Sequence, residues 1–144
     1  METIGALLWR VTNRWRAAVD RALAPLGLTH AQYALLASLY GLALQGRTPS
    51  QRELGDHAGF EPMYVSKVAR ALEQGGMLRR QRHEEDPRAL GLALTDRGTD
   101  VITRAMPIVA GLHRELTASI GGPDGPRARE LADVLRTLLG NQSK

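Results

Sequence analysis

The stretch from Ser50 to Thr95 decides the fold of this chain: SQRELGDHAGFEPMYVSKVARALEQGGMLRRQRHEEDPRALGLALT. Ser50 and Glu53 match the S-x-x-E pattern of a capping box, which satisfies free backbone donors at a helix start. Gly59 is placed to end that helix as a left-handed cap, and Pro62 suits the first turn of a following helix. The pattern therefore predicts two short helices separated by a tight turn.

The second of these helices has an apolar side and a cationic side. Its apolar residues recur at the i, i+3, i+4, i+7 spacing of a face that packs on a core, at Val65, Val68, Ala69 and Leu72. At about 100° per residue, the other side carries Met63, Lys67 and Arg70, flanked by Tyr64 and Ser66. A helix-turn-helix presents such a surface to the major groove of DNA, although an ordinary solvated face has the same pattern.

A charged hairpin follows this helix. Gly75-Gly76 stops the helix, a turn at His83–Pro87 reverses the chain, and a return strand from Arg88 to Leu94 alternates leucines on one side. The outgoing strand carries Arg79, Arg80 and Arg82. A two-stranded ribbon that bears arginines can reach phosphates or a minor groove. A helix-turn-helix followed by such a ribbon is a winged helix.

The order and spacing of these features resemble the MarR (multiple antibiotic resistance regulator) family of bacterial transcription factors. The matching positions are Leu54, Ala58, Ser66-Lys67, Leu72 to Leu78, Arg80, Asp86-x-Arg88 and Leu94-Thr95-Asp96-x-Gly98. The chain departs from the family at Pro87, where a basic residue is usual, and this removes a phosphate contact from the wing tip.

Composition limits the class of protein. With 144 residues the chain suits one domain with a real core. A net charge of +4 and a pI near 10.1 favour anionic partners such as nucleic acid. The absence of cysteine excludes disulfides and thiolate chemistry. No run reaches the about 18 apolar residues of a membrane helix, and no signal-peptide pattern begins the chain, so we expect no membrane partner and a cytoplasmic protein.

Amphipathic helices flank the winged helix. We expect helices from Thr3 to about Ala24, from His30 to Leu44, from Thr95 to Ile120 with a kink at Pro107, and from Arg127 to Leu139, then a loose tail at residues 140–144. The end helices could pack back on their own chain, but their apolar stripes and the family resemblance favour pairing with a second copy.

The expected fold class is mainly α with a small antiparallel β-wing. It forms one MarR-like domain over residues 1–144, with a winged helix-turn-helix DNA-binding lobe at 29–98, a wing at 79–94, and dimerisation helices at 1–28 and 99–144.

Each element contributes residues to a predicted DNA-binding surface. Lys67 and Arg70 suit phosphates or guanine edges, the helix start at Ser50 suits a phosphate, and Arg88 suits a narrow minor groove. Asp86 would repel DNA, and we interpret it as a brace for a wing arginine, either Arg80 or Arg82. The full set is Ser50, Gln51, Met63, Tyr64, Ser66, Lys67, Arg70, Arg80, Arg82, Asp86 and Arg88.

The resemblance implies a homodimer that binds double-stranded DNA at a palindromic operator, most often as a repressor, and that a small aromatic or anionic effector releases. Aromatic and polar residues on the helices that would line an effector pocket are Trp9, Trp15, His30, Tyr33 and His113. Each of these alone also suits a core or an interface.

Two other classes of protein are alternatives to a DNA-binding regulator. A winged helix can act as a protein–protein adaptor without reading DNA. An acidic exposed helix would favour that class, and the basic residues Lys67, Arg70, Arg82 and Arg88 argue against it. An enzyme is not expected, because the chain has no nucleophile elbow, Walker loop or dinucleotide fingerprint. The four histidines have no metal-ligand spacing. We therefore expect no catalytic residues, no cofactor and no metal.

Overall fold

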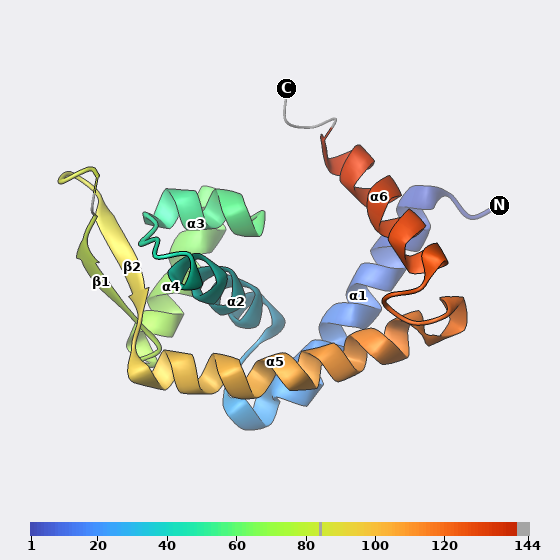
Figure 1. The fold of residues 1–144 in the computed structure, drawn as a ribbon, viewed down its shortest axis with the longest axis horizontal. Coiled ribbons are helices and arrows are strands. Elements are labelled where there is room, and N and C mark those ends of the chain that lie inside the picture. The colour runs from blue at the N-terminus through green and yellow to red at the C-terminus, as the bar shows by residue number, and fades with distance from the viewer. Residues whose placement is uncertain (84, 141–144) are drawn as a thin grey trace. The chain divides into compact units, whose positions relative to one another are not determined.

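Helices make up most of the computed structural model, which describes residues 1–83 and 85–140 (Figure 1). The helices are α1 (Ile4–Leu23), α2 (His30–Leu44), α3 (Gln51–Ala58), α4 (Pro62–Gln74), α5 (Asp96–Thr117) and α6 (Pro126–Gly140). Strands β1 (Leu78–Arg82) and β2 (Leu90–Leu94) form an antiparallel sheet. The predicted fold class is confirmed. The predicted loose tail lies outside the described residues, apart from Gly140.

The helix-turn-helix begins and ends where its sequence signals lie. The Ser50 hydroxyl accepts a hydrogen bond from the backbone amide of Glu53 at 3.1 Å, and the Glu53 carboxylate accepts one from the amide of Ser50 at 3.5 Å. Helix α3 ends at Gly59, whose φ of 77° is left-handed, and α4 starts at Pro62. Local chemistry therefore accounts for the bounds of both helices.

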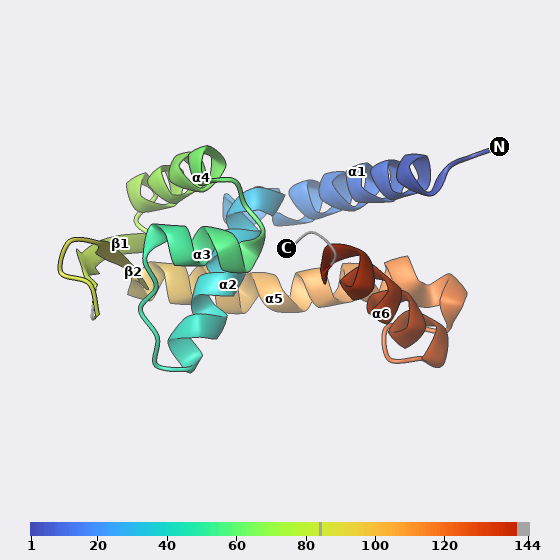
Figure 2. The same ribbon diagram turned by 90° about the horizontal axis from the view of Figure 1, so that it is seen from above.

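The apolar face of α4 is buried as predicted. Val65, Val68, Ala69 and Leu72 are each at most 6% exposed. Helix α4 packs against α2 and α3, and α2 also contacts α1 and β2 (Figure 2). Helix α2 contributes Leu35, Leu36 and Leu39 to the same core. Burial of this face leaves the cationic side of α4 directed outward.

The wing is shorter than predicted on its return side. Its register runs from Leu78 opposite Leu94 to Arg82 opposite Leu90. The expected start of the return strand at Arg88 is wrong by two residues, because the Ala89 amide donates to the Asp86 carbonyl at 3.1 Å and closes a turn there.

A short segment before α3 joins the wing sheet. In the structure the Leu92 amide donates to the Pro49 carbonyl at 2.8 Å, and Ser50 forms an isolated antiparallel bridge with Gly91. A side chain at Gly91 would lie 2.8 Å from the Thr48 methyl group, so the close pairing depends on this glycine.

Helix α5 begins at a close contact with the end of α4. The Thr95 hydroxyl donates to the Gly76 carbonyl and accepts from the Gly98 amide at 3.0 Å, which caps α5. The backbone of Gly98 lies so close to the Met77 carbonyl that a Cβ atom there would overlap it. The threonine and glycine of the L-T-x-x-G motif after the wing are therefore needed for the start of α5 to pack against the segment that follows α4.

The structure divides into two compact units, residues 1–107 and 108–144. Pro107 lies inside α5, which ends at Thr117 and is followed by a 3-10 turn at Ala118–Ile120, so the helix is shorter than expected. The lobe boundaries near residues 28 and 98 stay predictions. Within residues 1–83 and 85–140, no helix combines the length and apolar character needed to cross a bilayer.

We expect Gly98→Ala to lower the free energy of unfolding by about 1–3 kcal/mol, because the added methyl group has to displace the Met77 carbonyl. Gly41→Ala is the matched control. Gly41 lies inside α2 with nothing within 4 Å of an added Cβ, so this change should stabilise the protein by about 0.5–1 kcal/mol. Urea denaturation measures both variants, and equal stabilities would contradict the packing argument.

Candidate nucleic-acid interface

The outward side of α4 carries the polar and cationic residues that the sequence predicted. Lys67 and Arg70 are exposed, and Ser66 is half-buried. Met63 is 87% exposed and Tyr64 is 42% exposed, in the first turn of the helix. This side lies opposite the buried face, so all five side chains belong to one accessible strip.

The start of α3 offers backbone donors next to this strip. Ser50 uses its hydroxyl in the cap, and Gln51 is half-buried at the first helical position. Arg52 is exposed in the same turn, and the sequence analysis missed it. Its position at the start of α3 is the signal that could have identified it, since helix N-termini attract phosphates.

The arginines of the wing fall into two groups. Arg82 and Arg88 are exposed. Arg80 is half-buried, and its Nε atom lies 3.4 Å from the Glu73 carboxylate of α4. Arg80 therefore joins the wing to α4 and is less available than its two neighbours.

Asp86 acts on the backbone of the wing turn. Its carboxylate accepts a hydrogen bond from the Arg88 amide at 2.9 Å. From the sequence, we expected Asp86 to brace the side chain of Arg80 or Arg82. For Arg80 the structure gives a different partner, because its guanidinium pairs with Glu73. Asp86 instead shapes the turn from which Arg88 projects.

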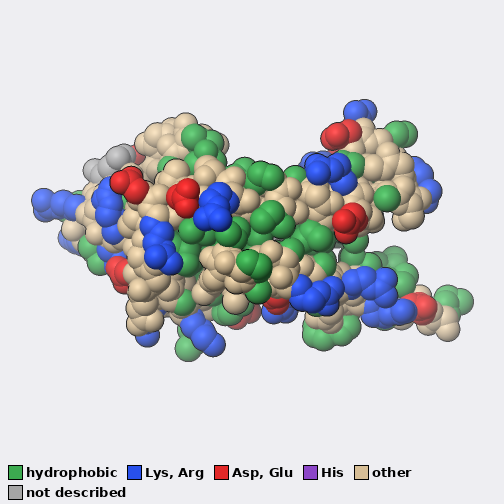
Figure 3. Space-filling model, turned by 90° about the horizontal axis from the view of Figure 1, so that it is seen from below, with side chains coloured by type: hydrophobic (Ala, Val, Ile, Leu, Met, Phe, Trp, Pro, Cys, Tyr) green, Lys and Arg blue, Asp and Glu red, His purple; other side chains and the backbone are tan. Residues whose placement is uncertain are grey.

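Figure 3 shows lysine and arginine side chains gathered at the left end of the view, over the wing. Among the described residues, the Glu53 carboxylate of α3 also lies beside the wing turn, 2.9 Å from the Nε2 atom of His83. Burial alone would raise the pKa of Glu53, but hydrogen bonds from Ser50 and His83 outweigh burial and lower it. Glu53 is therefore ionised at neutral pH and holds its donors in place.

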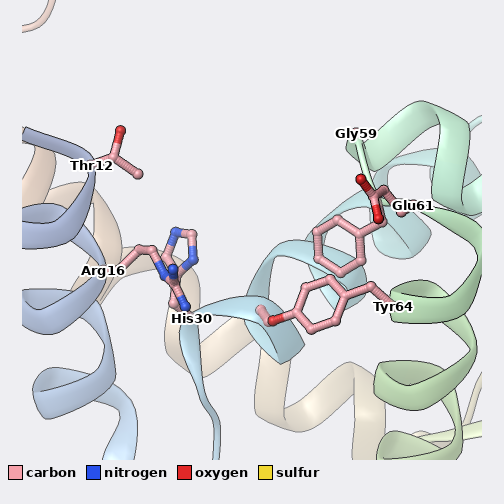
Figure 4. Close-up of a pocket in the computed structure, with 8 residues that line it drawn as sticks. Thr12, Arg16, His30, Gly59, Glu61 and Tyr64 are labelled. Atoms are coloured by element: carbon pink, nitrogen blue, oxygen red, sulfur yellow. The ribbon is translucent and has the colours of Figure 1, made fainter. Parts of the chain in front are cut away.

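A second site is a pocket of about 670 Å³ between α1, the start of α2 and the turn that joins α3 to α4 (Figure 4). Arg16 and His30 lie together on one side of it, and the Tyr64 hydroxyl points toward them from α4. The rings of Phe60 and Tyr64 are 5.1 Å apart. Glu61 also lines the pocket.

One of the five predicted effector residues lines this pocket, namely His30. Trp9 is 70% exposed on α1. Trp15 and Tyr33 are half-buried, and His113 is exposed on α5. The sequence analysis missed Arg16, Phe60 and Tyr64 as pocket residues because they come from three separate segments.

Burial lowers the pKa of His30 below its usual value, Asp20 opposes this effect, and Arg16 adds to it. The His30 imidazole is therefore mostly neutral at pH 7. Burial raises the pKa of Tyr33. In residues 1–83 and 85–140, no group of three or more His, Cys, Asp or Glu side chains is placed to hold a metal ion.

Comparison with known proteins identifies relatives of the whole chain. The MarR family model matches residues 28–90. An uncharacterised HTH-type transcriptional regulator of Bacillus subtilis, YdcH, is 36% identical over 115 residues, which cover 80% of this chain and 78% of the relative. The HTH-type transcriptional repressor Rv2887 of Mycobacterium tuberculosis is 33% identical over 135 residues, covering 94% and 92% of the two chains.

Solved structures of MarR-family regulators are also similar to this chain over nearly its whole length. The M. tuberculosis regulator MosR, in complex with DNA, is similar with a TM-score of 0.76 and 27% identity, covering 98% of this chain and 99% of that one. The MarR-family protein Rv2887 in complex with salicylic acid has a TM-score of 0.66 and 32% identity, covering 96% and 97% of the two chains. With its helix-turn-helix, wing and basic surface, the chain belongs to the MarR family of DNA-binding transcriptional regulators.

Proposed function

We propose that this protein is a transcriptional repressor that binds a palindromic operator as a homodimer and that a small aromatic carboxylate releases. The observation that carries the proposal is the exposed strip of α4, where Lys67 and Arg70 face outward because the opposite face is buried. Occupation of an operator blocks access to a promoter. By this proposal the protein acts in the cytoplasm, on chromosomal DNA.

The strip of α4 enters the major groove. Arg70 and Lys67 contact guanine edges or phosphates, which are the acceptors that suit their donors. Met63 and Tyr64 stand at the N-terminal end of α4, the part of a recognition helix that meets base edges. An exposed thioether at Met63 suits the methyl group of thymine.

The elements on either side of α4, namely the start of α3 and the wing, position this helix on the DNA duplex. Backbone amides at Ser50 and Gln51 lie at a helix N-terminus and suit a phosphate. Arg88 and Arg82 are exposed on the wing and suit the minor groove or its phosphates. These contacts fix orientation, while α4 supplies sequence discrimination.

A second copy of the chain covers the apolar residues of the end helices. In α1, Ile4 is 73% exposed and Val11 is 51% exposed. In α6, Leu131, Val134, Leu135 and Leu138 are 36–51% exposed and share one face by their i, i+3, i+4, i+7 spacing. A two-fold interface buries the same patch on both copies. It also presents two recognition helices to a palindrome.

The effector site we propose is the pocket at Arg16 and His30. The guanidinium of Arg16 supplies a charge-assisted hydrogen bond to a carboxylate, and the rings of Phe60 and Tyr64 supply an apolar surface. Tyr64 lies on α4, so a molecule bound here contacts the recognition helix. Such a contact shifts the population between DNA-binding and released spacings of the two helices.

We expect DNA selected from a random pool to contain a palindrome with half-site centres about 10 bp apart.

Arg70→Ala and Lys67→Ala should each weaken operator binding by about 1–3 kcal/mol if they contact bases. Arg104→Ala is the control, since it removes an exposed charge that pairs with Asp100 on α5. Log affinity should fall steeply with log salt. A flat salt response with no enriched sequence would favour a protein–protein adaptor.

We expect Leu135→Lys to convert the dimer into monomers at micromolar concentration, because it places a charge in the shared apolar face. Sedimentation velocity measures the mass, and circular dichroism checks that helicity is unchanged. Thr137→Lys adds the same charge on the other side of α6 and should leave the dimer intact. A monomeric wild-type protein would refute the dimer.

We expect salicylate, used as the probe carboxylate, to bind in the pocket and to weaken operator binding. Arg16→Gln should reduce its affinity roughly tenfold by removing a charged hydrogen bond. Glu61→Gln, which removes a carboxylate from the same pocket, should raise its affinity. Calorimetry measures both variants, and equal affinities would exclude this pocket.

The affinity for salicylate should also depend on pH. The pKa of His30 is lowered in the free protein, and an adjacent carboxylate raises it by favouring the imidazolium. The complex therefore takes up a proton, so affinity rises as pH falls through the bound-state pKa of His30 and levels off below the free-state pKa. His30→Asn should remove this dependence. A pH dependence that survives in the variant would argue against His30.

A further inference from the structure

His83 is buried in a turn whose other described residues are exposed. It follows β1 directly, and its side chain is 8% exposed, whereas Glu85, Asp86, Pro87 and Arg88 are exposed. A polar side chain that is buried at an exposed hairpin tip needs hydrogen-bond partners, and both ring nitrogens of His83 have them.

The two nitrogens bind different parts of the protein. The Nδ1 atom accepts hydrogen bonds from the backbone amides of Asp86 at 3.0 Å and Glu85 at 3.3 Å. The Nε2 atom lies 2.9 Å from the Glu53 carboxylate of α3. One side chain therefore connects the wing turn to a helix that lies 30 residues earlier in the sequence.

This set of partners assigns which of the two ring nitrogens carries the hydrogen that is donated to Glu53. An Nδ1 atom that accepts from two amides carries no proton, so the proton is on Nε2 and is donated to Glu53. The other charge at this position is Arg47, whose guanidinium lies 3.6 Å from the second oxygen of Glu53. The carboxylate is thus held from two sides and gives His83 a fixed anchor.

The contacts continue from His83 to Arg88. The Asp86 amide is bound to His83, and the Asp86 carboxylate accepts from the Arg88 amide at 2.9 Å. An unbroken series of hydrogen bonds therefore runs from Glu53 through His83 and Asp86 to the backbone of Arg88. The start of α3 and the position of Arg88 are set by the same series.

We propose that His83 is a positioning residue of the DNA interface, which joins the wing turn to α3 through its Nδ1 and Nε2 atoms and so holds Arg88 at the DNA. The proposal rests on the proposed function, in which Arg88 contacts DNA. His83 itself touches no DNA. Its contribution to affinity passes through Arg88, and this property separates it from a residue that only stabilises the fold.

The test is a pair of double-mutant cycles on the full-length protein, with the operator selected by the wild type as the DNA probe. His83→Ala should weaken binding about tenfold, because it removes all three hydrogen bonds that join the wing turn to α3. In an Arg88→Ala background the same change should cost little, because Arg88 no longer needs positioning. In an Arg70→Ala background it should again cost about tenfold, because Arg70 lies on α4 and acts independently.

His83→Asn gives a second readout. The asparagine oxygen lies where Nδ1 was and can accept from the Asp86 amide, so this variant should recover part of the affinity. If His83→Ala does not fold, the same two cycles are run with His83→Asn, for which the loss is smaller but should show the same dependence on Arg88.

Three outcomes overturn the proposal. Wild-type affinity in His83→Ala would show that the link is not used. Equal losses in the Arg88→Ala and Arg70→Ala backgrounds would show a general structural effect, while the proposed function would stand. An Arg88→Ala variant with unchanged affinity would remove the residue on which His83 acts. Failure of the wild type to select any DNA would instead refute the proposed function itself.

Discussion

The packing of four buried side chains of α4 sets the orientation of this helix, and so the direction in which its cationic side faces. Val65, Val68, Ala69 and Leu72 pack against α2 and α3, and burial of apolar side chains of this size contributes about 1.5–3 kcal/mol for each larger one. A helix has only one orientation that buries this stripe, so the same packing directs the cationic side outward. The exposure of the cationic side of α4, which the proposed DNA contact requires, is thus a consequence of core packing.

Backbone contacts and polar links join the wing to that core, together with the buried side chains of Leu78 and Leu92. The Leu92 amide binds the Pro49 carbonyl, Gly91 allows the close approach of the segment before α3, and Gly98 allows α5 to pass the end of α4. Arg80 pairs with Glu73 of α4, and His83 with Glu53 of α3. The wing is therefore joined to both α3 and α4. These contacts fix the position of its exposed arginines relative to the helix-turn-helix.

The helices at the two ends of the chain differ from the winged helix because their apolar residues are exposed. Apolar residues of α6 share a face but none is buried, and the N-terminal half of α1 is exposed in the same way. Exposed apolar side chains that share one face are typical of interaction surfaces in soluble proteins. In the proposed function, a second copy of the chain covers these residues and supplies the second recognition helix. The pocket beside Arg16 lies between such an end helix and α4, where an effector can influence both.

The sequence by itself determined the helices and their ends, because caps, glycines, prolines and the 3.6-residue period act over a few neighbouring residues: the capping box at Ser50, the left-handed Gly59 and the start at Pro62 all lie as predicted. It also indicated which side of α4 faces outward. Only the tertiary structure decided which arginines are exposed, what His83 binds, and which residues line the pocket. Contacts of this kind join Glu53 to His83 and Glu73 to Arg80, and the same packing brings Arg16 and Tyr64 to one pocket. No local pattern encodes them, since each depends on how separate segments meet after the core has packed.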